Sequence, residues 1–189
     1  MTKIAVLVGS LRKESFSKQL AENIMTLFPK GYDAEIIPLG NLPMYNQDFD
    51  SENEVPESLA DFRSKMNEMD AVLFVTPEYN RSIPAVLKNA IDSGSRPKPE
   101  SVWNGKPGLI VSNSPGHLSG FGANHHLRQS LSCLNMPLLQ QPEVYLANVK
   151  DLLGENGKIN KTETVEFLQS AVNGFVQLID MYEKQKVSS

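Results

Sequence analysis

Residues 4–18 read IAVLVGSLRKESFSK: five consecutive apolar residues, a polar loop that opens with glycine, and the beginning of a segment with helical spacing. A continuous apolar run is typical of a strand that is buried on both faces of a parallel sheet, whereas a half-exposed strand alternates. After the loop, apolar residues recur at the intervals of one helix face, at Phe16, Leu20, Ile24 and Leu27. The stretch therefore predicts one strand, one loop and one helix of an α/β fold.

The same arrangement recurs along the chain. Continuous apolar runs at 71–75 and 108–111 predict two further central strands. Two weaker strand candidates, 34–39 and 137–146, each contain a proline, which a sheet tolerates at its edges because proline cannot donate a hydrogen bond. Helical spacing predicts further helices at 59–66, 83–92, 122–134 and 162–182. Together these elements predict a three-layer α/β/α sandwich around a five-stranded parallel sheet of order 2-1-3-4-5.

The composition is that of one folded domain over residues 1–189, with 40% hydrophobic and 21% charged residues. The polar tail, residues 183–189, is expected to fray. The net charge of -4 and the scattered Lys and Arg residues argue against a nucleic-acid partner. The apolar run near the N-terminus is shorter than a signal sequence or a membrane span, so we expect a cytoplasmic protein with no membrane partner.

Neither a metal site nor a disulfide is expected. Cys133 is the only cysteine, so an internal disulfide is impossible, and its place near a leucine stripe predicts a small buried side chain. His125 and His126 are adjacent, so on a helix they point about 100° apart and cannot share a metal ion. We interpret both as surface or interface histidines. Trp103 precedes a turn and is expected to pack in the core.

Three polar loops follow the predicted central strands, at the edge of the sheet where ligands bind in open α/β folds. The first loop places hydroxyls, backbone amides and a guanidinium in front of a helix whose N-terminus carries partial positive charge, which suits a phosphate monoester. Its candidate residues are Ser10, Arg12, Ser15, Phe16 and Ser17. The loop matches neither the dinucleotide-binding nor the NTPase glycine pattern, and the alternative is that Ser15 or Ser17 only caps the helix.

The second and third loops are candidates for binding a planar ring. In the second loop, backbone amides and amphipathic side chains can cradle a heteroaromatic ring, although the same residues also suit an ordinary turn. Its candidates are Pro77, Glu78, Tyr79, Asn80 and Ser82. The third loop, 112–122, contains three glycines that permit close backbone approach, and its candidates are Ser112, Ser114 and Gly116. The roles of Arg81 and His117 stay open, and the length of the acidic segment 40–56 favours a functional loop.

Taken together, the three loops resemble those of the NAD(P)H-dependent FMN reductase family, a flavodoxin-like group that includes bacterial quinone and chromate reductases. The resemblance covers nearly the whole chain and implies a flavodoxin-like fold. Its most specific part is PEYN at 77–80 with Ser82 and Pro84, followed by LKNAID at 87–92. Further matching residues are Gly9 to Arg12, Ser15, Phe16, Ser114, Gly116, His126 to Gln129, Pro142 and Glu143.

The resemblance implies FMN as the cofactor and NADPH or NADH as the electron donor. It implies that residues 77–80 and 112–116 line the isoalloxazine ring, with Tyr79 near its face, and that the FMN phosphate is held by Ser10, Arg12, Ser15 and Ser17. We expect a ping-pong transfer of two electrons to a small-molecule acceptor, a quinone or a similar azo dye, chromate or nitroaromatic. The flavin carries this chemistry, so no catalytic side chain is named. A homodimer or homotetramer is also implied, with Arg128 and Glu143 as candidate contact residues.

The alternative function is a flavodoxin-type electron carrier, which binds FMN in the same fold and turns over no substrate. Against it, Arg12 and Lys13 interrupt the first loop, where carriers have turns rich in Ser, Thr and Gly, and carriers are usually more acidic than this chain. The sequence departs from the reductase pattern at Ser17, where asparagine is common, and at Pro115 and Ser119. The third loop borders the ring on the substrate side, so these departures bear on which acceptor is preferred.

Overall fold

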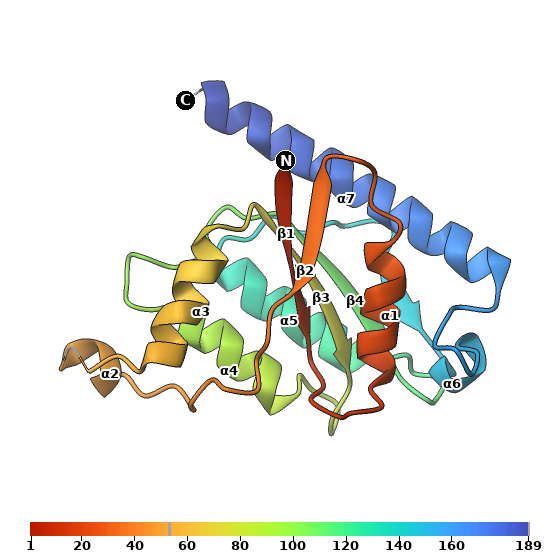
Figure 1. The fold of residues 1–189 in the computed structure, drawn as a ribbon, viewed down its shortest axis with the longest axis horizontal. Coiled ribbons are helices and arrows are strands. Elements are labelled where there is room, and N and C mark those ends of the chain that lie inside the picture. Colours follow the sequence, from red (N-terminus) through yellow and green to blue (C-terminus); the bar gives the residue numbers. More distant parts are fainter. Residues whose placement is uncertain (53, 189) are drawn as a thin grey trace.

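The computed structural model describes residues 1–52 and 54–188, and its centre is a five-stranded sheet between two layers of helices (Figure 1). The strands are β1 (Thr2–Val8), β2 (Tyr32–Ile36), β3 (Ala71–Pro77), β4 (Gly108–Asn113) and β5 (Val144–Leu146). Every neighbouring pair is parallel, and the order is β2-β1-β3-β4-β5. The predicted three-layer fold and its strand order are therefore confirmed.

Helices cover both faces of the sheet (Figure 1). One face is covered by α1 (Phe16–Met25) and α7 (Thr162–Ser188), and the other by α3 (Glu57–Asn67), α4 (Ala85–Gly94) and α5 (Phe121–Cys133). The structure adds two short helices that the sequence analysis does not predict, α2 (Asp48–Ser51) and α6 (Val149–Leu152). A single helical turn is too short to show a helical period in the sequence.

The central strands send side chains alternately into two apolar clusters, one on each face of the sheet. In β1, Ile4, Val6 and Val8 belong to the cluster with α1 and α7, while Ala5 and Leu7 belong to the cluster on the opposite face. All of these residues are buried, which explains why the run reads as continuous rather than alternating. Because both faces are filled, polar groups that bind a ligand must lie beyond the strand ends.

The two edge strands are shorter than the sequence predicts. β2 ends at Ile36, before Pro38, and β5 begins at Val144, after Pro142. Proline cannot donate to a ladder, and here both prolines lie outside the strands rather than on an exposed edge. The positions of β2 and β5 at the edges of the sheet are nevertheless as predicted.

The sequence predicts two side chains, Trp103 and Cys133, to be buried, and the structure buries only the first. Trp103 is fully buried, and its Nε1 donates to the carbonyl oxygen of Ile91 at 2.9 Å, which confirms its packing role. The prediction for Cys133 is wrong, because its side chain is exposed. The buried stripe of α5 runs through Leu127 and Leu131. Consecutive helical residues are about 100° apart, so Cys133 lies about 200° from Leu131, on the solvent side.

The last helix runs into the C-terminal segment, and the expectation that residues 183–189 fray stays a prediction. α7 is 27 residues long and continues to Ser188, and the Thr2 hydroxyl donates to Glu183 Oε1 at 3.0 Å. Position 189 lies outside the described residues. Despite the length of α7, no helix in the described part of the chain is both long and apolar enough to cross a membrane.

Candidate functional site

A cavity of about 340 Å³ lies where three loops meet at the carboxyl ends of β1, β3 and β4. The first loop joins β1 to α1, the second joins β3 to α4, and the third joins β4 to α5 (Figure 1). Strand order reverses at this point, which is the usual ligand position in an open α/β sheet. We call this the switch-point cavity. Its lining residues are Ser10, Arg12, Ser15, Phe16, Ser17, Pro77, Glu78, Tyr79, Asn113, Ser114, Pro115 and Lys150.

The first loop presents a hydroxyl group at the start of α1. Ser15 is the N-cap, and its Oγ accepts a hydrogen bond from the backbone N–H of Lys18 at 3.2 Å. Ser15 also lines the cavity, so capping and ligand binding are compatible roles rather than alternatives. Glycine is required at position 9, because a β-carbon there would lie 2.7 Å from Thr76 Oγ1. The first-turn amides of α1 have no partners within the helix, so together with this hydroxyl they can hold an anionic group.

Arg12 is held above the first loop by that loop's own backbone. Its Nε donates to the carbonyl oxygen of Glu14 at 2.9 Å, and its Nη2 donates to the same oxygen. The guanidinium carbon lies 5.1 Å from the centroid of the Phe16 ring, which is within cation–π range. A guanidinium has five N–H groups, so Arg12 can donate to an anion in the cavity while the loop holds it in place.

Asn113, which the sequence analysis does not single out, joins three of the elements that surround the cavity. Its Nδ2 donates to Ser17 Oγ at 2.9 Å and to the carbonyl oxygen of Thr76 at 3.1 Å, linking β4 to α1 and β3. Both Asn113 and Ser17 are buried. The sequence signal for Asn113 is a polar residue that ends a continuous apolar strand, because a buried amide of this kind needs partners.

The second loop contains a tight turn with left-handed backbone conformations at its centre. Tyr79 and Ser82 exchange two backbone hydrogen bonds of 3.1 and 2.9 Å, and between them Asn80 has a φ of 50° and Arg81 a φ of 65°. Positive φ at both central residues defines a type I′ turn. Asparagine tolerates this conformation better than arginine does, and residues held in this way cluster at functional sites. The turn places Tyr79, which is 53% exposed, at the rim of the cavity.

Glu78 connects the second loop to α5. Its Oε2 accepts a hydrogen bond from the backbone N–H of Ala123 at 3.2 Å, and its Oε1 lies 3.2 Å from Arg81 Nη1. A carboxylate near a helix N-terminus is stabilised by the helix dipole. Position 122 must be glycine, because a β-carbon there would lie 2.7 Å from the Arg81 carbonyl oxygen. Glu78 therefore caps the N-terminus of α5 and so connects the second loop, which forms part of the cavity wall, to that helix.

Nine of the thirteen predicted site residues line the cavity, and four lie outside its wall, namely Asn80, Ser82, Ser112 and Gly116. Asn80 lies within the turn, and Ser82 Oγ is 2.9 Å from His126 Nδ1. Ser112 is fully buried, and its Oγ accepts from Asn124 Nδ2 at 3.3 Å. The Gly116 N–H donates to Ser114 Oγ at 3.2 Å. The Gly116 contact lies within the third loop, the Ser82 contact joins the second loop to α5, and the Ser112 contact joins β4 to α5.

Lys150 lines the cavity from α6, outside all three loops. The Val149 N–H donates to the carbonyl oxygen of Ser114 at 3.1 Å, so α6 is attached to the third loop. Sequence reasoning missed Lys150 because a one-turn helix after an edge strand has no periodic pattern to mark it. Pro115, which lies in the 112–116 stretch expected to line the ring and also departs from the family pattern, lines the cavity as well.

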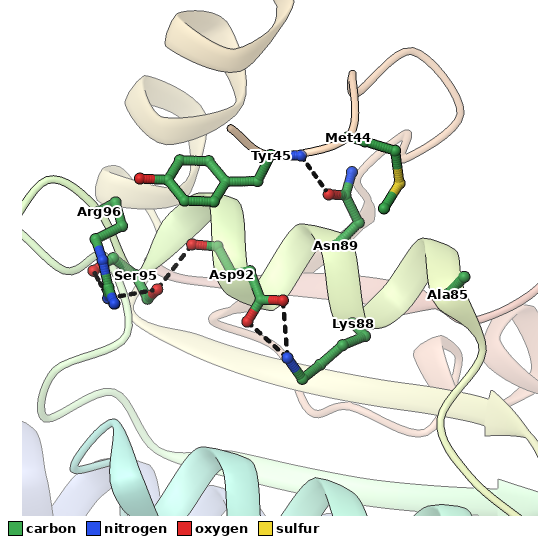
Figure 2. Close-up of a pocket in the computed structure, with 8 residues that line it drawn as sticks. All are labelled: Met44, Tyr45, Ala85, Lys88, Asn89, Asp92, Ser95 and Arg96. Atoms are coloured by element: carbon green, nitrogen blue, oxygen red, sulfur yellow. Dashed lines mark hydrogen bonds and ion pairs between the residues drawn. The ribbon is translucent and has the colours of Figure 1, made fainter. Parts of the chain in front are cut away.

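A second cavity, of about 350 Å³, lies between α4 and the segment that precedes α2 (Figure 2). We call it the α4 cavity; its lining residues are Met44, Tyr45, Ala85, Lys88, Asn89, Asp92, Ser95 and Arg96. Figure 2 shows its polar groups bonded to one another: Lys88 Nζ lies 2.8 Å from both carboxylate oxygens of Asp92. Asn89 Oδ1 accepts from the Tyr45 N–H at 2.8 Å. The long acidic segment thus forms one wall of a cavity on a helix surface.

The two residues named as candidate subunit contacts bind each other within the chain. Arg128 Nε lies 3.6 Å from Glu143 Oε1 and donates to Asn124 Oδ1 at 3.1 Å. Burial raises the pKa of Tyr145 to about 12, and the neighbouring Glu143 carboxylate adds to the shift, while the Tyr145 hydroxyl lies 3.1 Å from His125 Nε2. Tyr145 is therefore neutral at physiological pH. A role of this network in subunit assembly stays a prediction.

The donor set of the switch-point cavity suits a phosphorylated planar ligand. Hydroxyls, first-turn amides and the cations Arg12 and Lys150 are the groups that bind phosphate oxygens in proteins. Pro77 and Tyr79 add flat apolar surface for a ring. Over residues 1–52 and 54–188, no three His, Cys, Asp or Glu side chains gather into a group that could hold a metal ion.

Comparison with known sequences identifies close relatives. The family described as NADPH-dependent FMN reductase matches residues 2–151, which include all three loops and Lys150. A quinone reductase from Pseudomonas putida is 49% identical over 178 residues, which are 94% of this chain and 95% of that protein. A 2-hydroxy-1,4-benzoquinone reductase from a Burkholderia species is 43% identical over 92% of this chain and 93% of that protein.

A solved structure supports the same relationship. FerB, a flavoenzyme NAD(P)H:(acceptor) oxidoreductase from Paracoccus denitrificans, is 34% identical and superimposes with a TM-score of 0.89. The alignment covers 96% of this chain and 99% of that one, and it confirms the flavodoxin-like fold. The chain therefore belongs to the NADPH-dependent FMN reductase family of oxidoreductases, whose cofactors are FMN and NAD(P)H.

Proposed function

We propose that this protein is an FMN-dependent NAD(P)H:quinone oxidoreductase that binds its flavin in the switch-point cavity. Membership of the family makes the protein an oxidoreductase that uses FMN and NAD(P)H, and quinones are the acceptors in the names of two relatives. The proposal adds the position of the flavin and the roles of individual residues. One observation carries it: nine of the thirteen residues predicted for the cofactor line a single cavity at the strand ends.

The first loop binds the phosphate group in this proposal. Ser10, Arg12 and Ser15 offer hydroxyl and guanidinium donors beside the first turn of α1. Hydrogen bonds to a charged phosphate are about twice as strong as neutral ones, and the helix dipole adds to them. Asn113 holds the Ser17 hydroxyl at 2.9 Å, so this part of the wall is ordered before a ligand arrives.

The second and third loops flank the planar ring in this proposal, through Pro77, Tyr79, Ser114 and Pro115. When bound, FMN supplies two-electron hydride chemistry, with NADPH or NADH as the donor and a quinone as the acceptor. The half-exposed Tyr79 leaves the rim accessible to solvent, which favours a ping-pong cycle in which donor and acceptor occupy the same place in turn. An open rim also suits azo dyes, nitroaromatics and chromate as further acceptors.

The proposal extends to a homodimer or homotetramer in the cytoplasm. Leu118 and Phe121, which lie at the junction of the third loop and α5, are each 55% exposed and offer apolar surface to a second subunit. The single exposed cysteine suits a reducing compartment. Light scattering on the purified protein measures the assembly, and a monomer would contradict this part of the proposal alone.

Visible spectroscopy tests the central claim. We expect the purified or reconstituted protein to carry FMN, to lose its flavin absorption on anaerobic addition of NADPH or NADH, and to regain it when a quinone is added. Steady-state rates at several fixed quinone concentrations should give parallel double-reciprocal lines, because a ping-pong cycle has no ternary complex.

The other outcomes separate the alternatives. If FMN binds but neither nicotinamide bleaches it, the protein is an electron carrier and the enzymatic proposal fails. If FMN does not bind on reconstitution, the assignment of the switch-point cavity is wrong. Intersecting double-reciprocal lines would contradict only the ping-pong cycle.

A further inference from the structure

Lys150 lines the switch-point cavity but belongs to none of its three loops. Its helix, α6, is fixed on two sides: Val149 and Leu152 are buried in the core, and the Asn148 N–H donates to the carbonyl oxygen of Gly116 at 3.4 Å. The Val149 N–H adds a bond of 3.1 Å to the carbonyl oxygen of Ser114. The backbone of Lys150 is therefore held at the wall while its side chain is exposed.

The charged side chains around the cavity differ in whether they already have partners within the protein. Glu78 is bonded to Arg81 and to the N-terminus of α5, and Arg12 donates to the carbonyl oxygen of Glu14. Among the described residues, no ion pair engages the ammonium group of Lys150. Lys150 thus adds a cation whose charge is available to a ligand, in a cavity whose one lining carboxylate is already paired.

We propose that Lys150 recognises the phosphate group of FMN and thereby makes the protein distinguish FMN from riboflavin. The inference rests on the proposed function, because it takes the same cavity as the flavin site. A phosphate monoester carries about -1.5 to -2 charges at pH 7, whereas riboflavin has a neutral hydroxyl in its place. The planar guanidinium of Arg12 is held by the loop, while a lysine is a point charge on a flexible stem. The two cations together neutralise the phosphate.

Flavin binding to the apoprotein tests the proposal without any turnover. Quenching of flavin fluorescence gives the Kd of FMN and of riboflavin for the wild type, Lys150→Gln and Lys150→Arg. We expect Lys150→Gln to weaken FMN about tenfold, because a hydrogen bond to a charged group is lost, and to leave riboflavin within about twofold. Lys150→Arg keeps the charge and should keep most of the preference for FMN.

Lys13→Gln is the matched control, because it removes the same charge from an exposed position in the first loop that does not line the cavity. It should change the Kd of FMN by less than about threefold, since exposed charges are screened by salt. Added NaCl should weaken FMN binding more in the wild type than in Lys150→Gln. Circular dichroism and the Tm of each variant show that it is folded.

The proposal is overturned if Lys150→Gln binds FMN as tightly as the wild type, if it weakens riboflavin by the same factor, or if Lys13→Gln has an equal effect. In each of these cases the wild type still binds FMN, so the proposed function stands. If the wild-type apoprotein binds neither flavin, the proposed function fails and this inference fails with it.

Discussion

The switch-point cavity and the α4 cavity have nearly the same volume, about 340 and 350 Å³, but they use their polar groups differently. In the α4 cavity, Asn89 accepts from the Tyr45 N–H and donates to the carbonyl oxygen of Pro43, each at 2.8 Å. Lys88 is paired with Asp92 there (Figure 2). These groups hold a segment of irregular backbone on the helix surface.

In the switch-point cavity, several polar groups keep hydrogen-bond donors or charges that are not satisfied within the protein. Ser15 caps α1 with one lone pair and retains a donor. Among the described residues, neither Arg12 nor Lys150 forms an ion pair with a carboxylate. The first-turn amides of α1 also face this end of the sheet. Volume alone therefore does not identify a ligand site. What distinguishes the switch-point cavity is its position at the strand ends, where the Ser15 hydroxyl and the first turn of α1 meet two cations, and this difference can be tested.

Asn89→Ala should have the largest effect, and it should act on stability alone. The substitution leaves the Tyr45 N–H and the Pro43 carbonyl oxygen without their side-chain partner near a buried position, which lowers the free energy of unfolding by about 3 kcal/mol. Urea denaturation measures this loss. The Kd of FMN for the folded variant should stay within about twofold of wild type.

Lys88→Gln is the control for that experiment, because the Lys88 to Asp92 pair is half exposed and contributes at most about 0.5 kcal/mol. If Asn89→Ala weakened FMN tenfold, the two cavities would be coupled and the contrast between a structural and a ligand-binding cavity would break down.

Asp50, beside the α4 cavity, should make the stability of this region depend on pH. Hydrogen bonds from Arg63 at 2.6 and 3.0 Å, and one from the Tyr45 hydroxyl, hold the pKa of Asp50 below its usual range, while burial opposes the shift. A lowered folded pKa contributes stability that is present above the unfolded value of about 3.9 and is lost as the pH falls through the folded value.

Asp50→Asn should therefore lower the free energy of unfolding by about 2 kcal/mol at pH 7. The difference between variant and wild type should shrink as the solution is acidified below about pH 4, because the wild type then loses the same charge. Urea denaturation over a series of pH values measures it. A difference that stays constant down to pH 2 would show that the charge of Asp50 is not what stabilises this contact.

The sequence predicts the fold well because the buried strands have a simple signature. Continuous apolar runs mark β1, β3 and β4, and helical spacing marks the long helices. The edge strand boundaries are less accurate, since β2 and β5 are short and proline lies next to each. The one-turn helices α2 and α6 are set by tertiary contacts such as the bond from Val149 to Ser114, which no local pattern reveals.

The site residues also divide into those that a local sequence pattern marks and those that depend on tertiary contacts. Residues within the three loops are predictable because each loop directly follows a recognisable strand and because the loops resemble those of the family. Lys150 and the bridging role of Asn113 depend on which segments lie side by side in space, so sequence spacing does not expose them. Ser112 was predicted as a lining residue but is turned into the core toward Asn124, because residues of a strand alternate between its two faces.

Ser15 both caps α1 and lines the switch-point cavity, and two substitutions at this position can separate the two roles. Ser15→Ala removes the cap of α1 and a donor of the cavity, so it should cost about 1 kcal/mol of stability and weaken FMN about tenfold. Ser15→Asp keeps a capping oxygen but adds negative charge beside the phosphate. It should be as stable as the wild type and bind FMN at least as weakly as Ser15→Ala.

Denaturation and flavin titration of both variants check this expectation. If Ser15→Asp bound FMN normally, the phosphate would lie elsewhere, and the switch-point cavity would resemble the α4 cavity in serving structure alone.

The smallest effect should come from Arg81, in the type I′ turn of the second loop. Replacing Arg81 by either Gly or Ala removes its exposed ion pair with Glu78, so the difference between the two variants isolates the backbone. At a φ of 65°, a β-carbon is unfavourable and glycine is not, although glycine gains more entropy on unfolding. Arg81→Gly should therefore be more stable than Arg81→Ala by about 0.5 kcal/mol. Paired urea titrations resolve a difference of this size. If the two variants were equally stable, or if Arg81→Ala were the more stable, the turn would relax from its left-handed conformation in solution. It would then not hold Tyr79 rigidly at the rim of the cavity.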